Sequence, residues 1–135
     1  MENKHVITLW AIGLGVIVSA GLSLGADFGF EWLGWIPHGS LIISPLIALA
    51  VLFYRTLFNV LGSFIAAYLA PHYPMLHALV LGVIGIIIRF FGIAVSAKLN
   101  SSPAWYVWAL FLLAMPAALL GGELAAKLRA ALNKT

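Results

Sequence analysis

Four apolar runs, each long enough to cross a membrane as a helix, leave this chain few other ways to fold. They cover residues 6–26, 41–70, 75–97 and about 104–130. A helix rises 1.5 Å per residue, so about 20 residues cross the roughly 30 Å of hydrocarbon in a bilayer. The runs predict an all-α, polytopic transmembrane four-helix bundle that forms a single domain over residues 1–135.

Composition indicates that lipid is the main solvent of the folded chain. Hydrophobic residues make up 64% of the sequence and charged residues 8%, against about 25% charged residues in a soluble domain. So few polar groups cannot cover the surface of a globule in water. The chain has no cysteine, which excludes a disulfide framework and thiolate ligands.

The first apolar run has some features of a secretory signal peptide, because Lys4 precedes it. It spans about 21 residues, whereas the apolar core of a signal peptide has about 7–15. The sequence "SLGAD" that ends it is a poor match to a cleavage site between small residues. These features favour a retained spanning helix.

Polar breaks place the expected turns. Residues 27–40, "DFGFEWLGWIPHGS", contain two acids, a proline, and the tryptophans Trp32 and Trp35, which are typical of a membrane–water interface. "PHYP" at 71–74 and "KLNSSP" at 98–103 predict the other two turns.

The second run is longer than a membrane requires. Residues 41–70 would form a helix of about 45 Å, which must tilt or protrude. Pro45 falls in its first turn, where a missing N–H costs little. An alternative breaks this run at Arg55 into two re-entrant pieces of about 14 residues, each too short to span. In the fourth run, Pro116 predicts a kink.

Basic residues at the helix ends predict the orientation. One side carries Lys4, Lys127, Arg129 and Lys134, and the other carries only Lys98. Because lysine and arginine accumulate in cytoplasmic flanks, we expect both termini in the cytoplasm of a bacterial inner membrane. The basic C-terminal cluster is interpreted as a membrane flank or a solvated tail, so no nucleic-acid partner is expected.

Two arginines lie within the apolar runs, Arg55 in "VLFYRTLFNVLG" and Arg89 in "IIIRFFG". On regular helices both would lie roughly 21–23 Å from the turn between the second and third helices. We expect them at one depth on adjacent antiparallel helices, in the outer half of the membrane. An arginine at the bilayer centre costs about 2.5–3.5 kcal/mol unless it is paired or hydrated.

Three interpretations of these arginines stay open. In the first they snorkel to lipid headgroups or to Asp27 and Glu31, and serve only folding and orientation. In the second they line a polar cavity with these acids and bind an anion, either a lipid phosphate or a small solute. Asn59 lies one turn from Arg55 and would join that cavity. The third is a proton or ion path, in which an acid or a histidine carries the proton because arginine stays charged.

No pattern in the sequence predicts catalysis, a metal or a cofactor. The metalloprotease, P-loop and nucleophile-elbow motifs are all missing. His72 and His77 lie five residues apart, whereas two helical metal ligands usually lie three or four apart. His38 lies in a polar segment where solvation explains it, and Glu123 pairs with Lys127 along its helix. We therefore expect a protein that is not an enzyme.

Small residues recur at four-residue spacing in every run. In lipid, helices associate through close packing at such positions. Packing within one chain and packing in a homo-oligomer are both open. The small residues are Ala11, Gly15, Ser19 and Ser23, with Gly21 and Gly25, in the first run; Gly62, Ala66 and Ala70 in the second; Ala78 and Gly82 in the third; and Ala114, Ala118, Gly122, Ala126 and Ala130 in the fourth.

Residues 54–85 and 102–128 resemble small bacterial four-helix integral membrane proteins of unassigned function. The likeness is a glycine-rich helix ending in Ala-Pro, a Pro-then-His helix start, a Pro-x-Trp-Tyr start, and Gly-Gly before a basic tail. The chain departs at Tyr68 and Glu123, where the pattern tends to be basic. The resemblance implies an inner-membrane protein with no known activity. The matching residues are Gly62, Pro71, Pro74, His77, Gly82, Pro103, Trp105, Tyr106, Pro116, Gly121 and Gly122.

Two functions are therefore expected. The first is a non-enzymatic multi-pass membrane protein that acts as a structural or accessory subunit, with membrane lipid as its main partner. The alternative is a small transporter or channel subunit that binds an anionic solute or lipid headgroup through Arg55 and Arg89.

Overall fold

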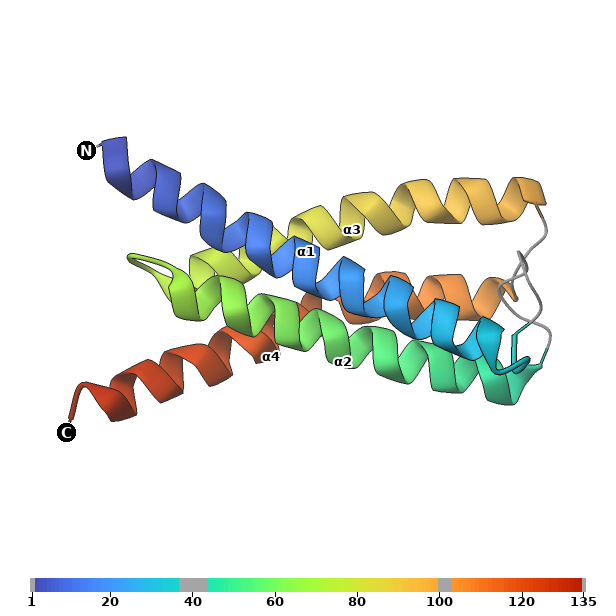
Figure 1. The fold of residues 1–135 in the computed structure, drawn as a ribbon. Coiled ribbons are helices and arrows are strands. Elements are labelled where there is room, and N and C mark those ends of the chain that lie inside the picture. Colours follow the sequence, from blue (N-terminus) through green and yellow to red (C-terminus); the bar gives the residue numbers. More distant parts are fainter. Residues whose placement is uncertain (1, 37–43, 100–102, 135) are drawn as a thin grey trace.

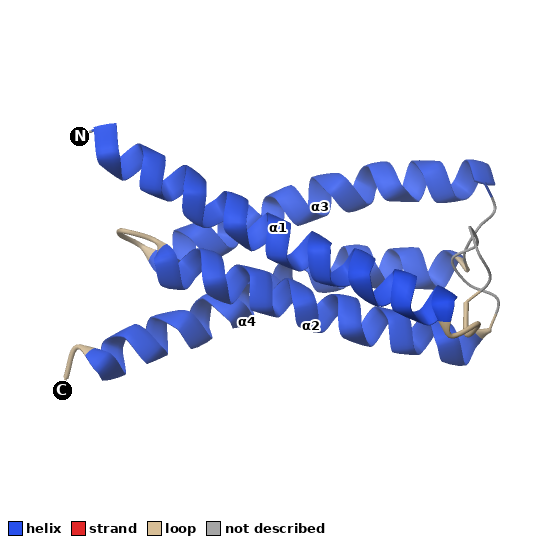
Figure 2. Cartoon of the chain, in the orientation of Figure 1, coloured by secondary structure: helices blue, strands red, loops and turns tan. Residues whose placement is uncertain are grey.

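The computed structural model describes residues 2–36, 44–99 and 103–134. Within these ranges the chain is almost entirely helical and has no strand, which confirms the predicted all-α fold (Figure 1, Figure 2). All four helices of this part of the chain are long and apolar enough to cross a membrane. Their bounds are Glu2–Trp32 for α1, Pro45–Leu69 for α2, Pro74–Leu99 for α3 and Ala104–Leu132 for α4.

The helices run up and down along one long axis (Figure 1). One end, which we call the terminal end, holds both termini and the turn between α2 and α3. The opposite end, which we call the loop end, holds the last turn of α1 and the first turns of α2 and α4. Helices α1 and α3 separate toward the loop end (Figure 1). There α2 and α4 stay packed around a buried cluster of Ile36, Ala48, Val51, Tyr106 and Leu110.

Helix α1 is longer than the sequence predicted. It continues past the expected end at residue 26 and stops at Trp32. Asp27 and Glu31 therefore lie on a helix, and the expectation that they belong to a loop was wrong. The physical reason is that Asp27 to Trp32 contains no proline, so nothing in it forces the helix to end.

A glycine ends α1. Gly34 has φ of 74°, a left-handed conformation that favours glycine. Its N–H donates to Glu31 O at 3.0 Å, and Trp35 N–H donates to Phe30 O at 3.0 Å. This pair of bonds is the Schellman motif, which satisfies carbonyls that the last helical turn would otherwise leave open.

Helix α2 is continuous through Arg55, so the alternative with two re-entrant pieces was wrong. Pro45 occupies the first turn as predicted. The Ser44 side chain accepts a hydrogen bond from Ile47 N at 3.3 Å and caps the helix. The start predicted at Leu41 lies outside the described residues.

The last two helices extend slightly beyond their predicted bounds. Helix α3 ends at Leu99 and α4 at Leu132, against expected ends at residues 97 and 130. Pro116 lies inside α4, which remains helical around it. The ribbon of α4 nevertheless changes direction along its length, as expected for a helix with an internal proline (Figure 1).

Glycines bring the helix backbones together where α1, α2 and α4 meet. A Cβ added to Gly15 of α1 would lie 2.6 Å from Gly62 O of α2. A Cβ added to Gly121 of α4 would meet the backbone of α2, including Phe64 N at 2.8 Å. Small residues therefore pack within one chain at these positions, in the manner of other membrane helices.

The GxxxG motif of α1, formed by Gly21 and Gly25, differs from these glycines in its packing. A Cβ added to Gly21 or Gly25 would find no described heavy atom within 4 Å. This face of α1 is therefore open, and it contributes no packing to the described part of the bundle.

Candidate functional site

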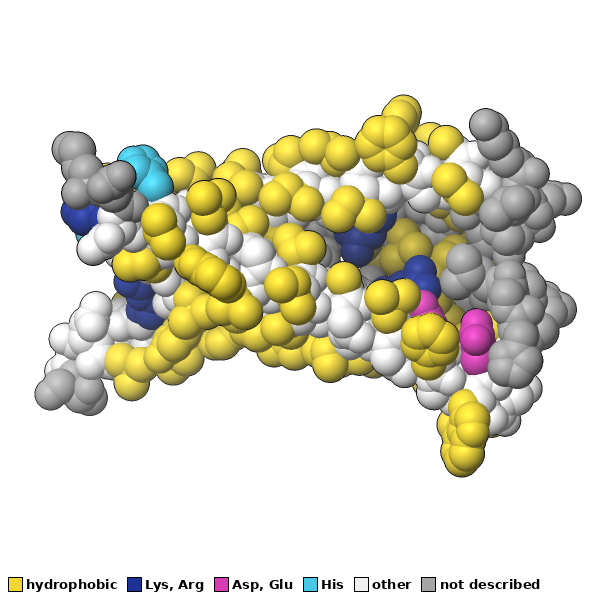
Figure 3. Space-filling view, turned by 45° about the horizontal axis from the view of Figure 1, so that its top comes forward, with side chains coloured by type: hydrophobic (Ala, Val, Ile, Leu, Met, Phe, Trp, Pro, Cys, Tyr) yellow, Lys and Arg dark blue, Asp and Glu magenta, His cyan; other side chains and the backbone are white. Residues whose placement is uncertain are grey.

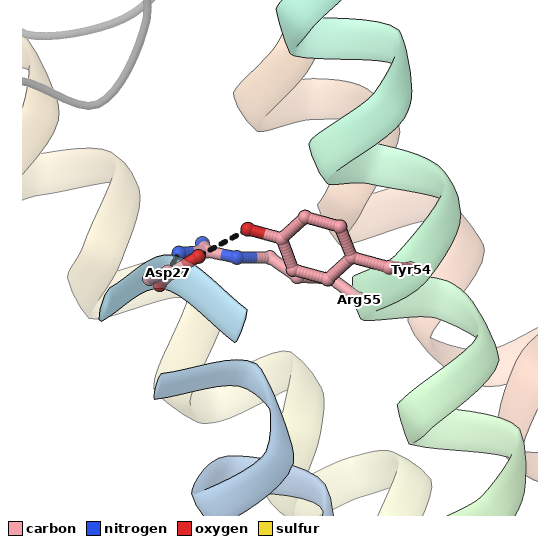
Figure 4. A network of polar contacts seen from close by, with 3 residues as sticks. All are labelled: Asp27, Tyr54 and Arg55. Atoms are coloured by element: carbon pink, nitrogen blue, oxygen red, sulfur yellow. Dashed lines mark hydrogen bonds and ion pairs between the residues drawn. The ribbon is translucent and has the colours of Figure 1, made fainter. Parts of the chain in front are cut away.

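An ion pair joins α1 to α2 near the loop end (Figure 4). Arg55 Nη2 donates to Asp27 Oδ2 at 2.5 Å, and the Tyr54 hydroxyl donates to Asp27 Oδ1. The side chains of Arg55 and Asp27 are about one-fifth exposed, at 21% and 19%. Tyr54 and Arg55 are neighbours on α2, and the carboxylate lies between their polar groups. The expectation that Asp27 supplies an anion for an embedded arginine is thus met at Arg55.

Arg89 has no such partner. Its Nη1 atom is buried and forms no hydrogen bond with any described residue. A Cβ added to Gly85 would lie only 3.5 Å from this nitrogen, so the guanidinium folds back along α3. Helical side chains lean toward the N-terminus of their helix, and the missing side chain at Gly85 leaves room for this arrangement. The guanidinium therefore turns toward the middle of the bundle, which differs from outward snorkelling.

Both arginines line one cavity of about 220 Å³. Asn59 of α2 lines it too, as expected, and Ser19 and Ser23 of α1 add hydroxyl groups. The rest of the wall is aliphatic and comes from α1, α3 and α4. Basic side chains are visible in a hollow of the surface on this half of the molecule (Figure 3).

Neither of the two acids lines the cavity, although the sequence placed both there with the arginines. Asp27 joins the site through its ion pair with Arg55. Glu31 lies one turn beyond Asp27 on α1, nearer the loop end. His38, which the sequence grouped with these two acids, lies outside the described residues. Of the predicted site residues, the structure thus brings together Arg55, Arg89, Asn59 and Asp27.

The electrostatics of the site favour an anion. Arg55 and Arg89 lie close enough for their charges to repel one another. With two guanidinium groups and the Asp27 carboxylate, the formal charge of the cluster is +1. Asn59 Nδ2 donates to Ala114 O of α4 at 3.1 Å, so this amide also has a structural role.

Two tyrosines of the site were missed by sequence reasoning. Tyr54 shares the Asp27 carboxylate, and Tyr106 of α4 lies within electrostatic range of both arginines. The Tyr106 hydroxyl is buried and has no hydrogen-bond partner among the described residues. Tyr54 could have been found from its position beside Arg55. Nothing in the apolar pattern of α4 indicates which of its faces turns toward the arginines.

Comparisons with protein-family models, with curated proteins and with solved structures give no match to this chain. The site is therefore interpreted from its own chemistry. Across the described ranges, no group of three or more histidine, aspartate or glutamate side chains could hold a metal ion. Guanidinium, hydroxyl and amide groups all donate hydrogen bonds, and two arginines outweigh one acid, so this cavity suits an anionic group.

Proposed function

We propose that this protein is a non-enzymatic, multi-pass protein of a bacterial inner membrane that binds an anionic group in the cavity beside Arg55 and Arg89. Of the two functions expected from the sequence, the geometry of this cavity favours the anion binding of the second. A purely structural or accessory subunit is the competing function. The two differ in what Arg89 does, because Arg55 already has a protein partner.

One observation carries the proposal: Arg89 Nη1 is buried beside the cavity and has no hydrogen-bond partner among the described residues. Arginine cannot avoid this situation by losing its proton. A central arginine in a membrane helix costs about 2.5–3.5 kcal/mol, and pairing is the usual way to reduce that cost. An anion in the cavity would supply the pair that the described residues do not.

The distribution of charge supports the proposed topology. Lys4 and Lys134 lie near the two termini, and the Lys127–Glu123 pair lies in the second half of α4, so these three lysines lie toward the terminal end. Figure 3 shows basic side chains at that end, besides those in the hollow of the loop half. Asp27 and Glu31 lie toward the loop end. By the positive-inside rule, the terminal end faces the cytoplasm and the cavity lies in the outer half of the membrane.

Thermal unfolding in a neutral detergent tests anion binding. The wild-type protein, Arg89→Gln and the matched control Arg129→Gln are titrated with inorganic phosphate and, separately, with phosphatidylglycerol. A ligand that binds only the folded state raises the unfolding temperature with its concentration. We expect at least one probe to stabilise the wild type and Arg129→Gln, and neither to stabilise Arg89→Gln.

The same experiment separates the two functions. Without any probe, Arg89→Gln should unfold at the same temperature as the wild type or higher, because it removes an unpaired buried charge. A marked loss of stability in Arg89→Gln, with no response of the wild type to either probe, would instead support a structural role.

A further inference from the structure

We infer that the anionic group is the phosphate diester of a membrane phospholipid, which reaches the cavity sideways between α1 and α3. This inference rests on the anion binding proposed above, and it adds the class of ligand and the route of entry. Three features carry it: the charge of the cluster, the apolar walls beside it, and the closed floor below it.

The charge matches a singly charged anion. Two guanidinium groups and one carboxylate leave one positive charge, and a phosphate diester carries one negative charge. Arg89 can present its planar fork of donors to two phosphate oxygens, which is the geometry that arginine favours for phosphate. The hydroxyl groups of Ser19 and Ser23 line the same cavity and can donate to the remaining oxygens.

The walls suit an amphiphile better than a hydrated ion. Val16 and Ala20 of α1 and Ile84 and Ile88 of α3 line the cavity next to the polar groups. The cavity volume of about 220 Å³ is far smaller than a whole phospholipid. This space accepts a headgroup and not a whole lipid, so the acyl chains must leave through the side. Helices α1 and α3 diverge on this half of the bundle (Figure 1), and the surface is hollowed beside the basic side chains there (Figure 3). The cavity is lined from both helices.

The floor of the cavity argues against passage along the bundle axis. Toward the terminal end, Gly15 of α1 and Gly62 of α2 bring their backbones together. Leu81, which lines the cavity, packs against the same point, since a Cβ added to Gly15 would lie 2.7 Å from Leu81 Cδ1. A ligand that enters the cavity is therefore held at this level.

The depth of the site is compatible with a headgroup. Arg89 lies 14 residues from Met75, hence about 21 Å from the terminal end of α3. In a core of roughly 30 Å the Arg89 backbone is about 9 Å below the far interface. Its guanidinium lies deeper, because it folds back along α3 toward Gly85. Lipid phosphates and water are drawn to embedded arginines by local thinning of the bilayer, so a displacement of this size is expected.

Three probes distinguish the sources of phosphate: phosphatidylglycerol, phosphatidylcholine and inorganic phosphate. They are compared on the full-length protein by thermal unfolding and by native mass spectrometry of retained lipid. We expect phosphatidylglycerol to bind at least tenfold more tightly than phosphatidylcholine, whose ammonium group adds a second positive charge beside Arg89. Arg89→Gln should lose this preference. Inorganic phosphate at the same concentration should have no effect.

A second variant tests the route. Ala20→Trp narrows the side opening at an exposed position of α1 and leaves both arginines in place. We expect it to fold normally and to bind phosphatidylglycerol at least tenfold more weakly than the wild type. The control is Leu57→Trp, which adds the same side chain at an exposed position of α2 that does not line the cavity.

Each outcome has a distinct meaning. Equal binding of phosphatidylglycerol by the wild type and Arg89→Gln, or full phosphatidylglycerol binding by Ala20→Trp, would overturn the inference. Stabilisation by inorganic phosphate through Arg89, with no effect of phosphatidylglycerol, would overturn the lipid as ligand and leave the proposed anion binding intact. If no probe acts through Arg89, the proposed function fails together with the inference.

Discussion

In the half of the bundle near the terminal end the helices meet through small residues, whereas near the loop end α1 and α3 separate around charged side chains. Ala67, Ala78 and Ala125 form a fully buried cluster in the first region. In the second, Arg55 and Arg89 line a cavity. The pocket at the terminal end, beside Tyr73 and Met75, is lined almost entirely by apolar side chains, whereas the cavity with charged walls lies in the loop half.

The three arginines on the helices differ in the partners that the chain offers them. Arg129, at the terminal end, donates to the Ala70 O atom at 2.8 Å and to Ala67 O at 3.4 Å, which are among the last carbonyls of α2. Arg55 pairs with a carboxylate. Arg89 Nη1 has no hydrogen-bond partner within the described ranges. Arg129 and Arg55 thus have partners in the chain, although Arg55 Nε, like Arg89 Nη1, is buried without one among the described residues; of the three, Arg89 is the one for which no partner is observed there.

The largest effect is expected where packing is tightest. In Gly121→Leu, the new side chain would collide with the backbone of α2 at Val60 and Phe64, which cannot move without displacing the helix. We expect a loss of about 3 kcal/mol or more in the free energy of unfolding, measured in detergent by loss of helical circular dichroism.

The matched control is Gly21→Leu, which places the same side chain on the open face of α1. We expect no change in its stability, and a loss equal to that of Gly121→Leu would contradict the packing described here. Size-exclusion chromatography of the control also tests the homo-oligomer, because packing between copies through this face would be disrupted.

The next effect concerns the ion pair of the loop half. Asp27→Asn leaves Arg55 without its carboxylate, and removing one partner of a fully buried pair costs about 3–5 kcal/mol. Because both side chains are about one-fifth exposed, we expect a smaller loss of about 2 kcal/mol in the free energy of unfolding. Chemical denaturation monitored by tryptophan fluorescence measures it.

Glu123→Gln is the control for this change. It breaks the Lys127 pair at 2.7 Å, whose side chains are 71% and 56% exposed. An exposed pair of this kind contributes little to stability, because solvent and salt screen it. If Asp27→Asn proves no more destabilising than Glu123→Gln, the Arg55–Asp27 pair does not hold α1 to α2.

A smaller effect is expected at the terminal end. Arg129→Gln removes the donors to Ala67 O and Ala70 O, and hydrogen bonds from charged groups contribute about 1.5–3 kcal/mol when well formed. One of the two is long and the side chain is only half-buried, so we expect a loss of about 1.5 kcal/mol in the free energy of unfolding. A loss of anion response in this variant would contradict the assignment of ligand binding to the other half.

Sequence reasoning correctly predicted the features that a lipid environment requires, namely the type and number of the elements. The four apolar runs predict four helices because a membrane requires each backbone group to be satisfied within its own segment. The equal distances of Arg55 and Arg89 from one turn also placed them together correctly, since the rise of a helix is constant. These conclusions depend on length and not on which face of a helix turns inward.

Sequence reasoning failed where the structure depends on the rotation of a helix about its axis or on a local contact. Helices that are apolar on every side do not reveal their buried face, so Tyr106 of α4 gave no sign that it turns toward the arginines. The direction of Arg89 depends on the space at Gly85, four residues earlier on the same helix. The extent of α1 depends on Gly34, whereas the acids at 27 and 31 predict an earlier end.

The smallest effects come from the two tyrosines of the site. Tyr54→Phe removes the hydroxyl that donates to Asp27, and a neutral hydrogen bond contributes about 1 kcal/mol to stability. Tyr106→Phe removes a buried hydroxyl that has no partner among the described residues, so its loss should be neutral or slightly stabilising. The two variants delete the same atom from neighbouring helices, and their difference isolates the Asp27 contact. If Tyr106→Phe is the more destabilising of the two, its hydroxyl has a partner in the folded protein, and a ligand or water in the cavity becomes the first place to look.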